Sequence, residues 1–217
     1  MTTELLDELT DELRQQGLQV LGAFSLADSD APKNAVLIGN AGQKMWRVFS
    51  KSAEYSDGSP NPMDRWSSRI IGDLAERYQA DANYPFEQPY QPFQQWAVQA
   101  TGMQASPLGM LIHPEYGLWQ AFRGALVFER PIESPKIQAF YSKHPCDTCR
   151  DKPCLSACPV NAFDGNFFDV KGCRDYLPSE PGQACMMGGC KARNACPIGT
   201  DHRYSDAQIR FHMTAFM

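Results

Sequence analysis

The chain has 217 residues, of which 43% are hydrophobic, 21% charged and 11% aromatic, and its formal net charge at pH 7 is -5. This composition excludes a wholly disordered chain, and no apolar run approaches the roughly 18 uncharged residues that a membrane-spanning helix needs. The acidic balance, with Lys and Arg scattered along the chain, predicts that nucleic acid is not a main partner.

The first part of the chain alternates helical and strand patterns. Leucines recur at helical spacing ahead of Gly17, which predicts a helix over 3–16. Two short apolar runs bounded by turn residues predict buried strands at 18–24 and 35–39. Helical spacing of large apolar residues then returns and predicts a helix over 42–51.

The same alternation continues towards the middle of the chain. A helix is expected over 62–79, where large apolar residues recur every four positions. The stretch 81–93 is rich in Pro, Tyr, Phe and Gln and predicts an extended connection, followed by a short helix at 93–99. Two more strands are expected at 109–113 and 118–130.

The amino-acid composition of the chain changes near residue 143, because all eight cysteines lie between Cys146 and Cys196. We therefore expect an α+β domain over 1–142 and a smaller cysteine-bearing module over 143–200. The tail 201–217 contains an apolar run, so we expect it to pack back on the first domain.

The cysteines form two arrays that both end in Cys-Pro. The first has the spacing C-x2-C-x4-C-x3-C-P and consists of Cys146, Cys149, Cys154 and Cys158. The second consists of Cys173, Cys185, Cys190 and Cys196. The bacterial ferredoxin run is C-x2-C-x2-C-x3-C-P, and its fourth Cys ligates the other cluster of a pair. The arrays therefore predict two [4Fe-4S] clusters with crossed ligands: one on Cys146, Cys149, Cys154 and Cys196, the other on Cys158, Cys173, Cys185 and Cys190.

Two other uses of the thiols are compatible with the spacing. Two structural zinc sites would consume the same eight cysteines. The longer spacers also allow a changed ligand or the loss of one cluster. Disulfides are disfavoured, because the acidic, amphipathic N-terminus has no signal-peptide pattern and a reducing, cytoplasmic location is expected.

Three features resemble the corrinoid-linked iron–sulfur reductases, a group that includes epoxyqueuosine reductase, the reductive dehalogenases and, more distantly, cobalamin-processing proteins. They are the eight-cysteine region with its segment 168–177, the loop, strand and Pro-Glu-Tyr-Gly turn of 106–119, and the order of an α+β domain before the cysteine arrays. The position at which epoxyqueuosine reductases carry a proton-donating Asp reads here as residues 87–90, Glu-Gln-Pro-Tyr, which argues against epoxyqueuosine reduction.

The resemblance implies a nitroreductase-like α+β domain that holds a cobalamin (corrinoid), fed with electrons through two [4Fe-4S] clusters of a ferredoxin-like module. It also implies a low-potential electron donor such as a flavodoxin or a ferredoxin. Two alternatives remain: a non-catalytic electron carrier or docking partner, and a cobalamin-trafficking protein that reduces the vitamin without an organic substrate.

Four residues outside the cysteine arrays are candidates for cofactor binding. His113 and Tyr116, in and beside the predicted turn, are also candidate catalytic groups, although His113 alternatively hydrogen-bonds the turn backbone and Tyr116 covers a core edge. Trp119 and Arg123 are an even number of residues apart on a predicted strand, so they are expected to share a face and flank a planar cofactor. Packing and a surface ion pair are the alternatives for these two.

Overall fold

A computed structural model describes residues 3–26, 33–129 and 143–217, and the chain divides into two compact units. Within the described residues, unit 1 contains 3–26, 33–102 and 121–129, and unit 2 contains 103–120 and 143–217. None of the helices in these described ranges has the length and apolar character needed to cross a membrane.

Unit 1 is built on a four-stranded sheet in the order β1-β2-β6-β3. Its strands are β1 (Gln19–Leu26), β2 (Lys33–Ala41), β3 (Asp81–Asn83) and β6 (Gln120–Phe128). Strands β1 and β2 pair antiparallel, from Gln19 opposite Gly39 to Leu26 opposite Lys33. Strand β3 pairs antiparallel with β6. The structure thus confirms a mixed fold of helices with an antiparallel sheet.

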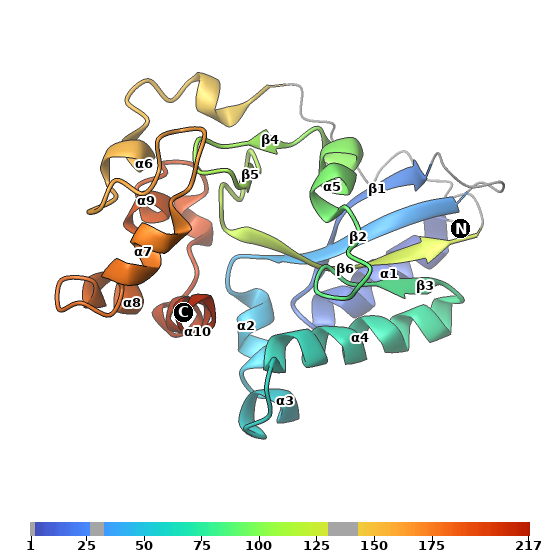
Figure 1. The fold of residues 1–217 in the computed structure, drawn as a ribbon. Helices are drawn as coiled ribbons and strands as arrows, with labels where there is room; N and C mark the ends of the chain where they lie inside the picture. Colours follow the sequence, from blue (N-terminus) through green and yellow to red (C-terminus); the bar gives the residue numbers. More distant parts are fainter. Residues whose placement is uncertain (1–2, 27–32, 130–142) are drawn as a thin grey trace. The chain divides into compact units, whose positions relative to one another are not determined.

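Helices cover both faces of this sheet. Figure 1 shows α4 and α5 on opposite sides of it. Every residue of β2 from Asn34 to Ala41 is buried, as expected for a central strand with both faces covered. The helices of unit 1 are α1 (Thr3–Gln15), α2 (Lys44–Phe49), α3 (Ala53–Ser56), α4 (Pro62–Tyr78) and α5 (Phe93–Thr101).

The apolar stripes of these helices form the core of unit 1. Leu9 and Leu13 of α1 and Trp66 and Ile70 of α4 are all buried, and the members of each pair lie on one side of their helix because they are four positions apart. Position 39 of β2 requires a glycine because the backbone at Ala121 passes close to it. An added Cβ would overlap the carbonyl of Ala121.

Unit 2 is made of short elements. A two-stranded ribbon pairs Gln104 with Ile112 and Ala105 with Leu111. Its strands and helices are β4 (Gln104–Ala105), β5 (Leu111–Ile112), η2 (Pro145–Asp147), α6 (Pro153–Ser156), α7 (Val170–Tyr176), α8 (Gln183–Gly188), α9 (Lys191–Asn194), η3 (Thr200–His202) and α10 (Asp206–Phe216).

Cysteines form much of the interior of unit 2. Its main apolar cluster contains the buried side chains of Leu108, Ile112, Leu118, Phe163, Cys154 and Cys196, with four further cysteines packed against it. The turn 113–117 lies directly against residues 198 and 199, because an added Cβ at Gly117 would overlap the carbonyl of Ile198. Thiols therefore share the centre of unit 2 with aliphatic and aromatic side chains.

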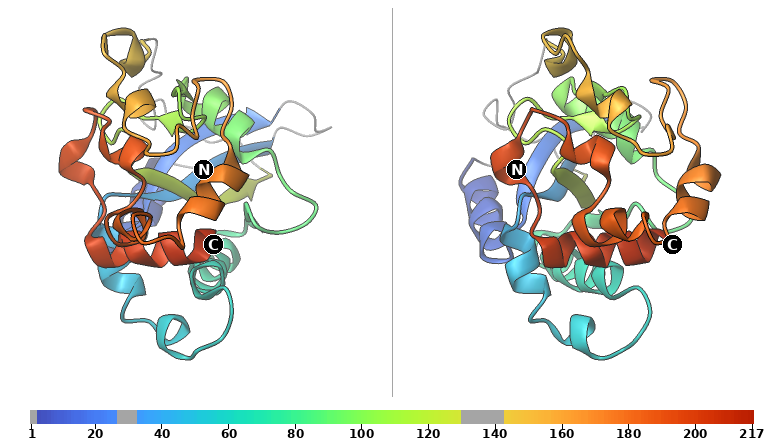
Figure 2. Two further views of the ribbon diagram at one scale, coloured as in Figure 1. Left: turned by 60° about the vertical axis from the view of Figure 1, so that its left-hand side comes forward. Right: turned by 90° about the vertical axis from the view of Figure 1, so that its left-hand side faces the viewer.

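The division into units differs in two places from the boundary expected at residue 142. The segment 103–120 belongs to unit 2, because its ribbon and turn supply apolar side chains to the cysteine-rich core. The tail also belongs to unit 2: α10 packs on α8, as the adjacent red and orange helices of Figure 2 show. An added Cβ at Gly189 would lie 2.9 Å from the side chain of Ile209. The apolar run of the tail is thus used within the cysteine-bearing unit.

The predicted elements differ from the observed ones mainly at their ends. The strand expected over 109–113 is shortened to β5, and the one expected over 118–130 begins only at Gln120. The connection expected over 81–93 contains the short strand β3. Neither α3 nor β3 was predicted, because four and three residues are too few to show a periodic pattern.

Candidate metal centres

The first group of thiols consists of Cys146, Cys149, Cys154 and Cys196. They come from η2, the loop after it, α6 and the loop after α9. The thiols of Cys146 and Cys154 interact electrostatically with those of Cys149 and Cys196. All four cysteines line one small cavity of about 20 Å³, together with the apolar side chains of Leu108, Ile112 and Leu118. Four thiols from two distant stretches of sequence therefore converge on one apolar pocket.

The second group consists of Cys158, Cys173, Cys185 and Cys190. The thiol of Cys173 interacts with those of Cys190, Cys158 and Cys185. Cys173 lies in α7 and Cys185 in α8, while Cys190 precedes α9. The structure thus arranges the thiols in the crossed order. Cys158 lies with cysteines of the second array, and Cys196 lies with cysteines of the first; these are the two cysteines followed by proline.

The protein environment disfavours free thiolates at several of these positions. Burial, reinforced by neighbouring thiolates, raises the pKa of Cys146 to about 11 and that of Cys173 to about 11. Burial also raises the pKa of Cys154, Cys185, Cys190 and Cys196. Four thiolates held together therefore need positive charge among them, and a metal centre supplies that charge.

Backbone N–H groups point at several of the sulfurs. The N–H of Ala162 donates to Sγ of Cys158 at 3.3 Å. The N–H groups of Arg193 and Ala192 donate to the thiol of Cys190, and that of Ile198 donates to the thiol of Cys196. Such donors stabilise negative charge on sulfur. The donor set and its surroundings therefore fit a metal–thiolate centre at each group.

A single metal ion and a cluster place different demands on the arrangement of four thiols. Within the described ranges, no three His, Cys, Asp or Glu side chains are arranged as they would be around one metal ion. Zinc holds its sulfurs at about 2.3 Å, which requires four thiols in very close contact. The thiolates of a [4Fe-4S] cluster bind four separate irons, so a cluster does not require all four sulfurs around one ion.

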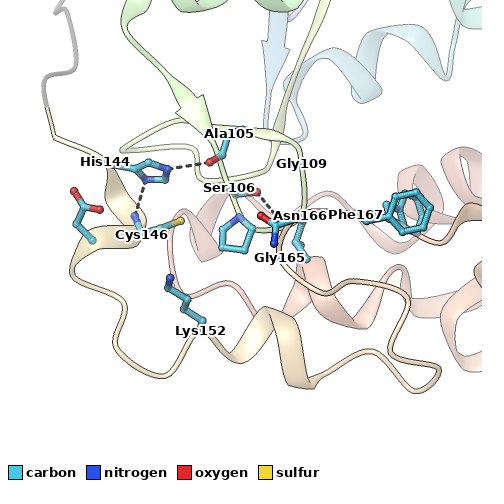
Figure 3. Close-up of a pocket in the computed structure, with 13 residues that line it drawn as sticks. Ala105, Ser106, Gly109, His144, Cys146, Lys152, Gly165, Asn166 and Phe167 are labelled. Atoms are coloured by element: carbon cyan, nitrogen blue, oxygen red, sulfur yellow. Dashed lines mark hydrogen bonds between the residues drawn. The ribbon is translucent and has the colours of Figure 1, made fainter.

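A larger cavity of about 430 Å³ lies beside the first group (Figure 3). It is lined by 13 residues, among them Ser106, His144, Cys146, Lys152 and Phe167. His144 is held by two hydrogen bonds: its Nε2 lies 2.9 Å from the carbonyl of Ala105, and its Nδ1 accepts the N–H of Cys146 at 3.0 Å. The side chain of Lys152 points towards Cys146 in Figure 3 and interacts electrostatically with its thiol. The cavity thus gives a molecule access to a member of the first group.

His113 organises its own turn. Its Nδ1 accepts the backbone N–H of Glu115 at 3.0 Å and of Tyr116 at 3.1 Å. The ring is buried and stacks on that of Tyr116, with centroids 4.2 Å apart. Burial lowers the pKa of His113 to about 4, so the neutral ring carries its proton on Nε2. The turn-bonding alternative for His113 is confirmed, and neither His113 nor Tyr116 lines the larger cavity.

The shared strand face expected for Trp119 and Arg123 is wrong. Because β6 begins at Gln120, Trp119 precedes the strand and belongs to unit 2, whereas Arg123 belongs to unit 1. The Nε of Arg123 donates to Oδ1 of Asn40 at 3.0 Å. Trp119 is instead buried against Tyr204, with ring centroids 5.4 Å apart, and the guanidinium of Arg193 lies over its ring.

Three residues at or near the thiols, Lys152, Arg193 and Tyr204, were not among the candidates expected from the sequence. Arg193 was visible only as a basic residue among cysteines, and nothing in the local pattern connects it with Trp119, 74 positions earlier. Contacts over such sequence distances are created by the fold.

Comparisons with known proteins found solved structures of similar fold but no matching sequence family. No family model matches the chain, and no curated protein matches it. Among solved structures, an epoxyqueuosine reductase with an epoxyqueuosine-modified stem loop of tyrosine tRNA superposes with a TM-score of 0.55 at 14% identity, over 94% of this chain and 67% of that one. The reductase from Bacillus subtilis gives 0.53 at 14% identity, with the same coverage.

A third similar structure is the B12-trafficking protein CblC of C. elegans. It superposes with a TM-score of 0.54 at 15% identity, over 97% of this chain and 90% of that one. At these identities the likeness shows a shared fold. The tRNA stem loop of the first structure contrasts with the expectation, drawn from charge, that this chain has no nucleic-acid partner.

Proposed function

We propose that the chain is an iron–sulfur redox protein with one [4Fe-4S] cluster on each cysteine group. The observation that carries the proposal is the division of eight thiols into two groups of four, each assembled from both arrays. Four thiolates are the ligand set of such a cluster, and the crossed exchange of the Cys-Pro cysteines is typical of two-cluster ferredoxins. Together these support a ferredoxin-like module in unit 2, and the helix-covered sheet is compatible with a nitroreductase-like unit 1.

Each cluster would supply transfer of single electrons. The contribution of the chain is to hold it, shield it and set its environment. Leu108, Ile112 and Leu118 line the small cavity of the first group and would shield a cluster from water on that side. The N–H groups of Ala162 and Arg193 donate to sulfurs of the second group and favour its more negative state. A low-potential flavodoxin or ferredoxin is the proposed donor.

We further propose a corrinoid or a partner's cofactor as the electron acceptor. The fold likeness to a B12-trafficking protein and to epoxyqueuosine reductases supports a corrinoid. The cavity beside Cys146 supports approach to the first cluster. Its volume of about 430 Å³ suits a drug-sized ligand, so a corrinoid, which is larger, would occupy it only in part. Ser106, His144 and Lys152 offer polar contacts there.

One observation favours cobalamin trafficking and reduction as a second candidate function. The chain matches 90% of the CblC structure but 67% of the epoxyqueuosine reductases. One experiment distinguishes the two candidate functions: reduced, cobalamin-loaded protein is incubated with an epoxyqueuosine-modified tRNA stem loop. Conversion of the modified base supports the reductase, whereas reduction of cobalamin without conversion supports trafficking.

The cluster proposal is tested by metal and sulfide analysis of anaerobically reconstituted protein. The expected result is iron and acid-labile sulfide near eight of each per chain, with a broad absorbance near 400 nm that bleaches on reduction. Stoichiometric zinc without sulfide would overturn it. The corrinoid proposal is tested separately by titration with cob(II)alamin, followed by visible and EPR spectra. An unchanged cobalamin spectrum at high protein concentration would leave the non-catalytic electron carrier as the function.

A further inference from the structure

Arg193 connects the two cysteine groups through its backbone. It lies in α9, between Cys190 of the second group and Cys196 of the first. Its N–H donates to the thiol of Cys190, and its carbonyl accepts the N–H of Cys196 at 3.2 Å. A single peptide segment thus contacts one cysteine of each group.

The side chain of Arg193 is clamped in one position. Its guanidinium carbon lies 4.2 Å from the ring centroid of Trp119 and 4.8 Å from that of Tyr204, and both rings are buried. Its Nη2 donates to the carbonyl of Leu118. Leu118 also lines the cavity of the first group, so the guanidinium is hydrogen-bonded to the backbone of a residue that lines this cavity.

The positive charge of Arg193 has no carboxylate counterpart among the described residues. Arg193 takes part in none of the ion pairs found in that part of the chain. Its Nε is buried and finds no hydrogen-bond acceptor there. The two rings contact each other, and the guanidinium lies over both of them. These cation–π contacts stabilise the cation, and negative charge close by would stabilise it further.

We propose that Arg193 is a positioning residue for electron transfer, whose fixed positive charge balances the negative charge of the two clusters and raises the reduction potential of at least one. The inference rests on the proposed function, because it requires clusters at both groups. Each four-thiolate [4Fe-4S] centre carries about two negative charges, and reduction adds one more, so a fixed cation nearby favours the reduced state. The contacts with Trp119, Tyr204 and Leu118 hold the guanidinium in place, so that it does not rotate out towards the solvent.

The test compares the reduction potentials of wild type, Arg193→Gln and Arg193→Lys by EPR-monitored redox titration. Arg193→Gln removes the charge but leaves the backbone of α9 intact. It should lower at least one of the two potentials by about 59 mV, equivalent to a tenfold change in a one-electron equilibrium. Arg193→Lys keeps the charge and should give an intermediate potential. Arg210→Gln is the matched control, because Arg210 is an exposed cation of α10 and its removal should leave both potentials unchanged.

Each outcome decides the proposal. Arg193→Gln protein with full iron and sulfide content and wild-type potentials at both steps would overturn it, as would an equal shift in Arg210→Gln. If Arg193→Gln fails to assemble clusters, Arg193→Met replaces it as the variant that removes the charge, and wild-type potentials at both steps in that variant would overturn the proposal. If the wild-type protein contains no iron and sulfide, the proposed function fails, and this is known before any variant is made.

Discussion

Cys154 and Cys158 stand four residues apart in the sequence, yet their thiols belong to different groups. Cys154 interacts with Cys196 and Cys149, whereas Cys158 interacts with Cys173, Cys185 and Cys190. The helix α6 carries Cys154 and ends at Ser156, so the chain turns away before it reaches Cys158. This separation makes the ligand assignment testable with pairs of substitutions.

The first prediction concerns the crossed assignment. Cys158→Ala combined with Cys185→Ala should remove one cluster and leave about four irons per chain, because both thiols serve the second group. Cys154→Ala combined with Cys158→Ala should remove both clusters. Iron and sulfide analysis of reconstituted variants measures this. An assignment in the order of the sequence gives the opposite result, with the second pair keeping one cluster and the first pair losing both.

The second prediction concerns removal of the metal. Six cysteines belong to the main apolar cluster of unit 2, so its folding should depend on bound clusters. Chelation of iron under reducing conditions should increase amide hydrogen exchange in α7, α8 and α10. Amides of β2 and α4 in unit 1 should remain protected, because their core contains no cysteine. Equal protection of unit 2 before and after chelation would contradict the prediction.

The third prediction concerns the contact between the turn 113–117 and residue 198. Gly117 has φ +56°, and an added Cβ would overlap the carbonyl of Ile198. Gly109 has φ +77° but nothing within 4 Å of an added Cβ, so it is the matched control. Gly109→Ala should cost about 1 kcal/mol of unfolding free energy from backbone strain, and Gly117→Ala about 2 kcal/mol more from the clash.

Thermal loss of the cluster absorbance near 400 nm measures the effect of both glycine variants. The melting temperature of Gly117→Ala should fall clearly below that of Gly109→Ala. Equal melting temperatures for the two variants would show that the turn does not pack tightly on residue 198.

The fourth prediction concerns protonation of His113. Its folded pKa of about 4 lies below the ordinary value of 6.5, so the neutral ring stabilises the fold above pH 6.5. This contribution should diminish as the pH falls from about 6.5 towards 4, because the unfolded chain binds a proton on this ring over that range, whereas the folded turn keeps Nδ1 as the acceptor for the N–H groups of Glu115 and Tyr116. Hydrogen exchange of these two amides, corrected for intrinsic rates, should accelerate over that range.

His113→Phe provides the comparison for the pH effect. It has no acceptor at any pH, so the same amides should exchange quickly throughout and show no such acceleration. A wild-type turn whose protection is constant from pH 7 to pH 4 would disprove the proposed role of the ring.

Much of unit 1 was predictable because its patterns are local. The helices at 3–16 and 62–79 were expected within one residue of α1 and α4, since apolar residues at helical spacing show directly which face is buried. The strands expected at 18–24 and 35–39 correspond to β1 and β2. The ends of β5 and β6 were predicted less well, because strand ends depend on pairing partners that a single segment does not reveal.

The sequence by itself determined that eight thiols lie in 51 residues, and their spacing with two Cys-Pro endings predicted the crossed grouping. Only the tertiary structure decided that 103–120 and α10 join the cysteine-bearing unit, that Trp119 and Arg123 belong to different units, and that the guanidinium of Arg193 lies over the rings of Trp119 and Tyr204. The reason is physical. Ligand spacing is a property of neighbouring residues, whereas burial, stacking and charge balance depend on contacts between residues far apart in the chain.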